Sequence, residues 1–192
     1  MIEAGVAAVA ALLRRRGIPY VVIGGQAIAL TAATTTRDVD VMVATGDFAR
    51  TVRALREEPD LAFDWETRET ARFRLLSLGG VPLDVINGAA FAGKGSDQEF
   101  FRYLADEGSS EIDGVVFASP EAVWYTRLMT KRWKAYAEKI VTNVLDGVAP
   151  ERLDAAEGIG RRFGTTPQLA ERIAYVREEL ARPEVEALRR RP

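Results

Sequence analysis

The spacing of apolar and polar positions predicts alternating helices and short strands in the first part of the chain. Ile2–Arg16 has apolar residues at helical spacing and ends in three arginines before Gly17. Tyr20–Ile23 is a short β-branched apolar run, which is typical of a buried strand. Val39–Val43 alternates with period two and also predicts a strand. We therefore expect a β-sheet whose strands are separated by helices.

Further elements follow up to about residue 118. Gly79-Gly80 separates two predicted strands and favours an antiparallel hairpin, so the sheet is expected to be mixed. The remaining predicted elements are helices over Gln26–Thr31, Asp47–Glu58 and Ser96 to about Ala105, and strands over Leu61–Trp65, Ala71–Leu78, Val81–Ile86 and Gly114–Phe117.

After Ser119 the pattern predicts helices only. Pro120 favours the first position of a long helix, and later Gly and Pro residues interrupt the helical pattern in three places. The expected fold class is α/β (α+β), with a mixed sheet flanked by helices. We expect a core over residues 1–118 and a helical region over residues 119–192 packed on it.

The composition narrows the available chemistry. The 192 residues include neither histidine nor cysteine, which excludes thiolate nucleophiles, histidine bases and metals held by Cys or His. Any metal would depend on carboxylates, which prefer hard ions such as Mg²⁺, Mn²⁺ or Ca²⁺. No apolar run is long enough for a membrane span. The N-terminus is apolar before it is basic, the reverse of a secretory signal, so we expect a cytoplasmic protein.

Charge is unevenly distributed along the chain. Residues 1–123 contain 12 basic and 18 acidic residues, whereas residues 124–192 contain 14 basic and 10 acidic residues. In one long helix Arg127, Lys131 and Lys134 would share a face, because they are spaced i, i+4 and i+7. This basic face is consistent with a phosphate-bearing ligand or with an ordinary solvated helix surface.

Three aspartates lie in apolar strand patterns. Asp38 and Asp40 are two residues apart, so their carboxylates are expected on one side of the strand, roughly 6–7 Å apart. Asp84 lies between Leu83 and Val85 in another strand. If the two strands are neighbours, three carboxylates converge and can hold two magnesium ions, and Asp84 can accept a proton. Alternatively, each aspartate is an edge, capping or locally hydrogen-bonded residue.

Gly24-Gly25 lies between a predicted strand and a predicted helix. Without side chains, these residues let phosphate oxygens approach backbone N–H groups, and Gln26 can add a side-chain donor. The alternative is a plain turn.

The combined pattern resembles a known family. Ile23-Gly24-Gly25, a twelve-residue gap, Asp38-Val39-Asp40-Val41 and then Leu83-Asp84-Val85 are similar to the signature of the nucleotidyltransferase superfamily related to DNA polymerase β. The string Thr36-Arg37-Asp38-Val39-Asp40 resembles small bacterial members, namely antibiotic nucleotidyltransferases and abortive-infection toxins. The resemblance covers residues ~15–140.

The resemblance implies a fold, a reaction and a set of site residues. The reaction moves a nucleoside monophosphate from an NTP to an acceptor hydroxyl and releases pyrophosphate, with two Mg²⁺ (or Mn²⁺) ions bound. The implied catalytic and metal-binding residues are Asp38, Asp40 and Asp84, and the implied nucleotide-binding residues are Gly24, Gly25, Gln26, Arg37, Arg127, Lys131 and Lys134.

A later helical motif of the toxin-like members matches only in part. Arg127 stands where that motif has Lys, and Ala135 stands where it has Asp. The toxin-like group implies a tRNA or protein acceptor and an antitoxin partner, whereas the antibiotic group implies a small acceptor of the aminoglycoside or lincosamide type. Two further interpretations remain open: a catalytically silent nucleotide- or partner-binding module of this fold, and an unrelated α+β protein with structural carboxylates.

Overall fold

A computed structural model of the chain describes residues 4–32, 38–58, 72–76, 82–88 and 97–189. The strands within these residues are β1 (Tyr20–Ile23), β2 (Val39–Val43), β3 (Arg72–Leu76), β4 (Pro82–Asn87), β5 (Ser109–Ile112) and β6 (Val115–Ala118). The helices within them are α1 (Ala4–Arg15), α2 (Gly24–Ala29), α3 (Thr45–Arg56), α4 (Asp97–Asp106), α5 (Pro120–Met129), α6 (Trp133–Leu145), α7 (Arg152–Arg162), α8 (Thr166–Leu180) and α9 (Pro183–Arg189).

The described strands form one mixed sheet in the order β3-β4-β2-β1-β6-β5. β2 pairs in parallel with β4, and β1 pairs in parallel with β6. The pairs β1–β2, β3–β4 and β5–β6 are antiparallel. The expected mixed sheet flanked by helices is thereby confirmed, including the antiparallel pairing of the strands on either side of Gly79-Gly80. The predicted strand over Leu61–Trp65 and the glycine turn itself lie outside the described residues.

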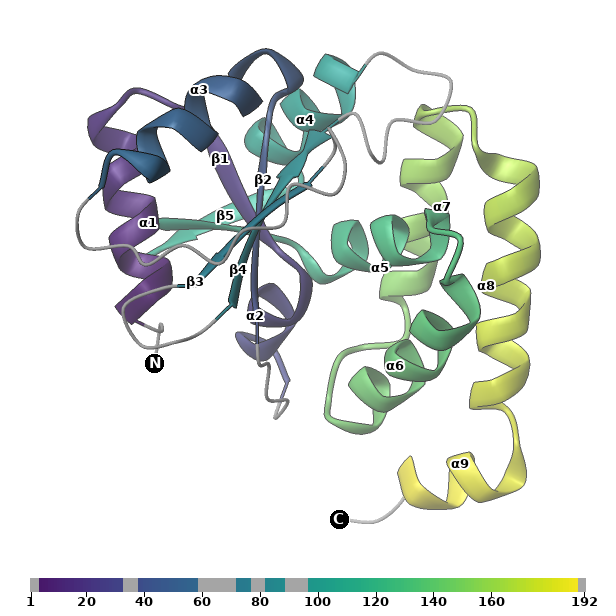
Figure 1. Cartoon of the computed structure of the whole chain (residues 1–192). Coiled ribbons are helices and arrows are strands. Elements are labelled where there is room, and N and C mark those ends of the chain that lie inside the picture. Colours follow the sequence, from purple (N-terminus) through teal and green to yellow (C-terminus); the bar gives the residue numbers. More distant parts are fainter. Residues whose placement is uncertain (1–3, 33–37, 59–71, 77–81, 89–96, 190–192) are drawn as a thin grey trace.

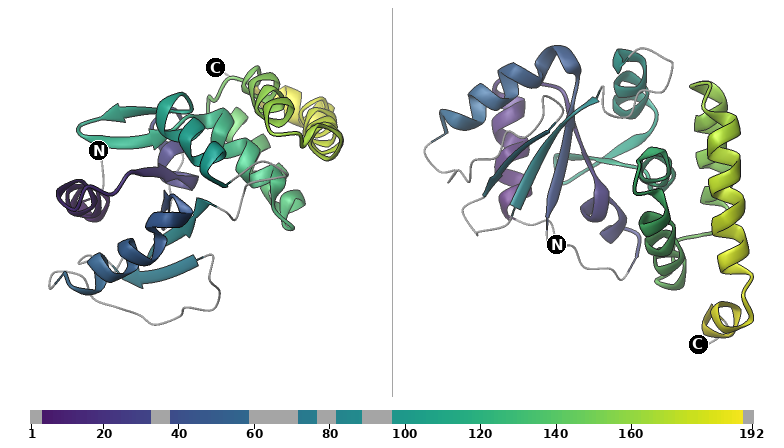
Figure 2. Two further views of the ribbon diagram at one scale, coloured as in Figure 1. Left: turned by 90° about the horizontal axis from the view of Figure 1, so that it is seen from above. Right: turned by 45° about the vertical axis from the view of Figure 1, so that its right-hand side comes forward.

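Helices cover both faces of the sheet. Figures 1 and 2 show α1 and α3 on one face, with α4 on the opposite face and helices α5–α9 beyond it. The two central strands are mostly apolar: every residue of β1 is buried, and in β2 only Asp40 is partly exposed. A strand that is buried on both faces has a continuous run of apolar residues, and Tyr20–Ile23 is such a run.

The edge hairpin β5–β6 was only half predicted. The strand over Gly114–Phe117 is found as β6, but β5 has mostly exposed residues and no apolar alternation. The turn residues indicated this hairpin in the sequence, because Asp-Gly is a dipeptide that favours tight hairpin turns. Asp113 has φ 48° and Gly114 has φ 75°, the two positive φ values of a type I′ turn.

The prediction of one long helix after Ser119 was wrong. The first helix ends at Met129, Thr130 is extended (φ −77°, ψ 164°), and α6 begins at Trp133. The Thr130 hydroxyl donates to the Arg127 carbonyl at 2.9 Å, and the Thr130 N–H donates to the same carbonyl. Such local bonds compete with the helical pattern, and no glycine or proline marked the break in the sequence.

α5 is the central helix of the C-terminal part. Its residues are buried on almost every side, and it packs against α2, α6, α7 and α8. The buried side chains of the sheet and of these helices belong to one hydrophobic core. In the described residues, the strands end at Ala118 and the elements from Pro120 onward are helices. The division into two domains at residue 118 remains a prediction.

An aromatic cluster joins α4, α5 and α7. Phe163 directly follows α7, and its ring centroid lies 5.3 Å from that of Phe100, 5.7 Å from that of Tyr103 and 6.4 Å from that of Tyr125. Arg162 stacks 5.0 Å from the centroid of Tyr103. Edge-to-face aromatic contacts of this kind stabilise a core beyond the area they bury. The cluster therefore couples the helix that covers the sheet to the helical region.

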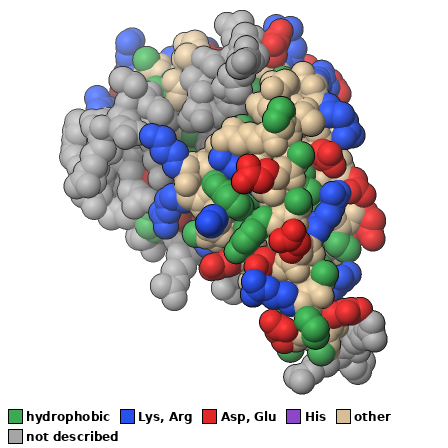
Figure 3. Space-filling model, turned by 90° about the vertical axis from the view of Figure 1, so that its right-hand side faces the viewer, with side chains coloured by type: hydrophobic (Ala, Val, Ile, Leu, Met, Phe, Trp, Pro, Cys, Tyr) green, Lys and Arg blue, Asp and Glu red, His purple; other side chains and the backbone are tan. Residues whose placement is uncertain are grey.

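Figure 3 shows the outer face of the helical region, where acidic and basic groups lie with hydrophobic side chains between them. Arg177 pairs with Asp154 and, at 3.7 Å, with Glu157. Exposed pairs of this kind contribute little to stability, so their main effect is a hydrophilic surface. In the described part of the chain, no helix combines the length and the apolar character needed to cross a bilayer.

We predict that Phe163→Ala lowers the free energy of unfolding by about 3–5 kcal/mol, because it leaves a cavity among three rings. Leu188→Ala is the matched control, since Leu188 is 48% exposed and its truncation should change stability by less than about 0.5 kcal/mol. Urea denaturation measures both. A near-zero effect at Phe163 would contradict the coupling of the helical region to the sheet.

Candidate functional site

The three predicted aspartates lie together at one end of the central strands. Parallel pairing of β2 and β4 sets Asp40 directly opposite Asp84. Neighbouring strands are about 4.8 Å apart, and opposed residues project from the same face of a sheet. Asp38 directly precedes β2 and lies two residues before Asp40, at the same end of the strand. The expected neighbourhood of the two strands is therefore found.

The three side chains differ in burial. Asp84 is fully buried, whereas Asp38 and Asp40 are partly exposed. A buried carboxylate needs hydrogen bonds or positive charge to offset its lost hydration. The site thus runs from a buried carboxylate on β4 to two carboxylates that a ligand can reach at the start of β2.

Gly24 lies against one of these carboxylates, that of Asp40. It follows β1, whose last residue Ile23 pairs with Asp40. Its φ is +74°, and a Cβ atom at this position would lie 2.2 Å from Oδ2 of Asp40. A side chain is therefore excluded for two reasons, the backbone conformation and the position of Asp40. The carboxylate lies directly against the backbone at the start of α2, where Gly25 and the partly buried Gln26 follow.

A positive charge faces the carboxylates from the helical region. Arg127 is partly buried in the last turn of α5, and α5 packs against α2. In Figure 1, α2 lies between the central strands and helices α5 and α6. Burial lowers the pKa of Arg127, and electrostatic interactions with Tyr136 and, after it, with Asp40 and Asp38 oppose that shift. Arginine stays protonated at neutral pH, so Arg127 provides a cation at the edge of the carboxylate site.

Residues of α6 hold this guanidinium. Arg127 Nη1 donates to Asn143 Oδ1 at 3.0 Å, and Arg127 Cζ lies 5.8 Å from the ring centroid of Tyr136. Asn143 is only 5% exposed. Sequence reasoning missed Asn143 because an isolated asparagine on a helix has no distinctive pattern.

The prediction that Arg127, Lys131 and Lys134 share one face of a single helix was wrong. Arg127 lies on α5, Lys131 lies between the helices, and Lys134 lies on α6, because the chain breaks at Thr130. Lys131 and Lys134 are exposed, and Lys134 Nζ lies 5.7 Å from the ring centroid of Trp133. Only Arg127 of these three is partly buried beside the carboxylates. Arg37 lies outside the described residues.

The donor set suits a hard metal ion, since it consists of carboxylate oxygens on adjacent strands. Within the described residues, no three His, Cys, Asp or Glu side chains are close enough together to hold a metal ion by themselves. Magnesium differs from calcium in this respect, because proteins usually hold it with one or two carboxylates plus water and substrate phosphates. The chemistry of these donors is that of a hard-ion site, but in the described residues the three aspartates do not by themselves form one.

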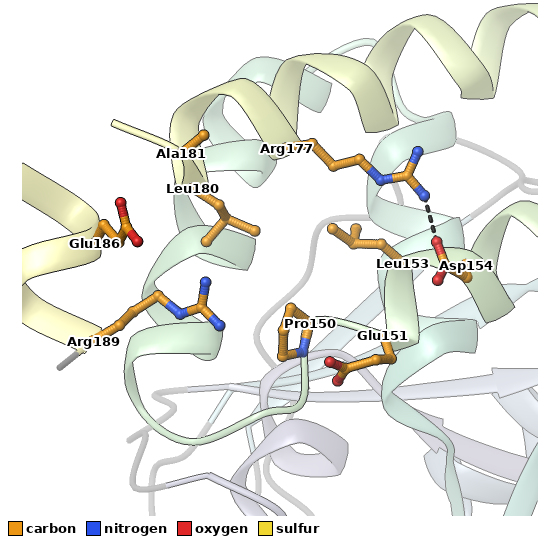
Figure 4. Close-up of a pocket in the computed structure, with 9 residues that line it drawn as sticks. All are labelled: Pro150, Glu151, Leu153, Asp154, Arg177, Leu180, Ala181, Glu186 and Arg189. Carbon is orange, nitrogen blue, oxygen red and sulfur yellow. Dashed lines mark hydrogen bonds and ion pairs between the residues drawn. The ribbon is translucent and has the colours of Figure 1, made fainter. Parts of the chain in front are cut away.

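A cavity of about 450 Å³ lies elsewhere in the described structure, among α7, α8 and α9 (Figure 4). Leu153 and Leu180 line it, and Arg177 at its rim already pairs with Asp154. The elements that line it do not include the strands with the aspartates. We assign the candidate site to the carboxylates, because chemistry depends on reactive groups brought together rather than on a cavity alone.

Comparison with solved structures agrees with this fold. No protein-family model matches the chain, and no curated protein sequence matches it significantly. The chain resembles the crystal structure of an antigenic nucleotidyltransferase-like protein from Paracoccidioides brasiliensis, with a TM-score of 0.55 and 19% identity over 96% of this chain and 89% of that one. JHP933 from Helicobacter pylori also aligns, with a TM-score of 0.36 and 12% identity over 97% and 98% of the two chains, a likeness too low to support an argument. The chain therefore has a nucleotidyltransferase-like fold.

We predict that Gly24→Ala destabilises the protein by at least about 1–2 kcal/mol, the cost of a left-handed conformation for a residue with a Cβ. It should also displace the Asp40 carboxylate. Gly46→Ala is the matched control, because Gly46 lies in α3 with no heavy atom within 4 Å of the added Cβ. That change should be neutral or slightly stabilising.

The contact with Asp40 can be isolated by a double-mutant cycle, measured by chemical denaturation. Gly24→Ala should cost less in an Asp40→Ala background, since the overlapping oxygen is then absent. Equal costs in both backgrounds would show that Asp40 does not lie against Gly24.

Proposed function

We propose that this protein is a magnesium-dependent nucleotidyltransferase of the toxin-like kind. It transfers a nucleoside monophosphate from an NTP to a hydroxyl of a tRNA or protein acceptor and releases pyrophosphate. The observation that supports this most is the register of β2 and β4, which sets Asp40 opposite Asp84 with Asp38 at the same end. The nucleotidyltransferase-like fold supports the same conclusion.

The proposed role of each site residue follows from its position and exposure. Asp38 and Asp40, the more exposed pair, would hold Mg²⁺ together with the triphosphate, and Asp84 would be the third ligand or the base. When bound, the ions supply positive charge for the attacking and leaving oxygens. Gly24 and Gly25 leave space for phosphate oxygens near backbone N–H groups, with Gln26 as an added donor. Arg127 contributes a fixed cation, and Arg37, Lys131 and Lys134 remain further candidates for phosphate contact.

The bonds in the proposed reaction balance without a redox partner. The acceptor oxygen forms a bond to the α-phosphorus, and the bond from that phosphorus to the oxygen bridging to the β-phosphate breaks. Pyrophosphate leaves with the bond electrons. The hydroxyl proton passes to a carboxylate, for which the buried Asp84 is our candidate, and then to water.

The exposed basic residues beside Arg127 favour an anionic acceptor. Lys131, Arg132, Lys134 and Lys139 are exposed around the corner between α5 and α6. Such charges attract a phosphate backbone and would repel a cationic aminoglycoside. A tRNA acceptor is therefore our first candidate among the acceptors, and an antitoxin that masks this corner is the corresponding partner.

We predict that Asp38→Asn, Asp40→Asn and Asp84→Asn each lower the rate of label transfer from α-³²P-NTP by about 10²–10⁴-fold, because they remove metal ligands or the base. EDTA should abolish transfer, and thiol reagents should have no effect, since the chain has no cysteine. The assay is a panel of four labelled NTPs with Mg²⁺ or Mn²⁺.

Asp106→Asn is the matched control, because Asp106 is an exposed carboxylate at the end of α4. It should keep full activity. Thermal unfolding with and without Mg²⁺ and NTP separates binding from turnover. If the wild-type protein binds NTP but never releases pyrophosphate, the silent-module interpretation replaces the enzyme. Full activity in the Asp40 variant would exclude the proposed site.

The acceptor is tested in the same assay with total tRNA, the protein itself, an aminoglycoside and a lincosamide offered separately. We expect label on tRNA, and we expect its formation to fall steeply between about 50 and 200 mM salt because several phosphate contacts are screened. Label on the antibiotic alone would instead favour an antibiotic nucleotidyltransferase. Label on protein alone would retain the toxin-like assignment with a protein acceptor.

A further inference from the structure

A buried arginine of α8 connects the two helices that frame the site. Arg172 is 9% exposed, and its Nη1 donates to the carbonyl of Leu128 and, at 3.5 Å, to that of Thr130. Its Cζ lies 5.3 Å from the ring centroid of Trp133. One side chain thus contacts the end of α5, the extended residue after it and the first residue of α6.

These contacts fix the corner at which the two helices meet. The last carbonyls of α5 have no intrahelical partner, and a guanidinium can donate hydrogen bonds to more than one such carbonyl. Trp133 also packs edge-on against Tyr175, 5.4 Å between centroids, so α8 contacts this corner at two points. α8 therefore braces the corner between α5 and α6.

The same corner determines where the Arg127 guanidinium lies. Arg127 is two residues before Met129 at the end of α5, whereas its acceptor Asn143 and the neighbouring Tyr136 belong to α6. If the helices moved apart, Arg127 would lose both contacts while keeping its backbone position. A free arginine side chain has many rotamers, and fixing one before a ligand binds removes that entropy cost from binding.

We propose that Asn143 and Arg172 are positioning residues that hold Arg127 toward the strand carboxylates and thereby set the affinity for the NTP triphosphate. Asn143 acts directly on the guanidinium, and Arg172 acts by fixing the corner between α5 and α6. This inference rests on the proposed function, in which Arg127 contacts phosphate. It gives the C-terminal helices a role in the site beyond covering the core.

The test compares steady-state kinetics and NTP binding by calorimetry for wild type, Asn143→Leu and Arg127→Met. Leu has nearly the shape of Asn but offers no acceptor oxygen. We expect Asn143→Leu to raise KM and Kd for NTP about tenfold, the typical loss of one hydrogen bond to a charged group, while kcat changes less than about threefold. In the Arg127→Met background the added effect of Asn143→Leu should be less than about twofold, because both act through one guanidinium.

Thr165→Val is the matched control. Thr165 is 7% exposed in the same helical region and bonds to Tyr125 Oη and the Gly160 carbonyl, with no contact to Arg127. It should leave KM unchanged. Arg172→Lys and Arg172→Met test the corner independently: Lys retains one charged donor and should raise KM less than Met does. Unfolding curves confirm that each variant is folded, and Asn143→Ser replaces Asn143→Leu if the latter does not fold.

The outcomes separate the inference from the function on which it depends. Unchanged KM in a folded Asn143 variant overturns the positioning role and leaves the proposed function intact. So do fully additive effects of Asn143→Leu and Arg127→Met, because two independent structural losses would add. A wild-type protein that neither binds NTP nor transfers a nucleotide overturns both.

Discussion

The site depends on one feature of the sheet, the parallel register that sets Asp40 opposite Asp84. Two carboxylates on adjacent strands repel each other, and the buried one also loses its hydration. Such an arrangement persists only where the surrounding apolar strands fix it, as the buried residues of β1 and β2 do here. Gly24 completes the arrangement, because the Asp40 carboxylate occupies the space that any side chain at residue 24 would need.

The helical region adds a positive charge near this end of the inner strands. The described strands supply negative charge at Asp38, Asp40 and Asp84, and α5 brings the positive charge of Arg127 close enough to interact with two of them. Because α5 is buried among α2, α6, α7 and α8, its last turn is packed as part of the core. A helix that appears in the sequence as ordinary core thus fixes the position of a charged group.

Much of the fold was predictable from local pattern. The apolar strands and the antiparallel pairing of the strands on either side of Gly79-Gly80 follow from period-two spacing and turn residues. Two features were not recovered. The edge strand β5 has exposed polar residues and no apolar alternation, although Asp113-Gly114 marked its turn. The break at Thr130 has no glycine or proline. There the Thr130 hydroxyl donates to the Arg127 carbonyl, and the Thr130 carbonyl accepts from Arg172, a residue more than forty positions away.

The sequence by itself determined the chemistry available to this protein: carboxylates without histidine or cysteine, placed in strands with glycines beside them. These are properties of residue type and of spacing within one element, which local sterics control. Only the tertiary structure decided that Asp84 lies opposite Asp40, and that Arg127 rather than Lys131 or Lys134 lies partly buried beside the carboxylates. Strand register and helix orientation depend on packing between distant segments, and no spacing within a single segment encodes that packing.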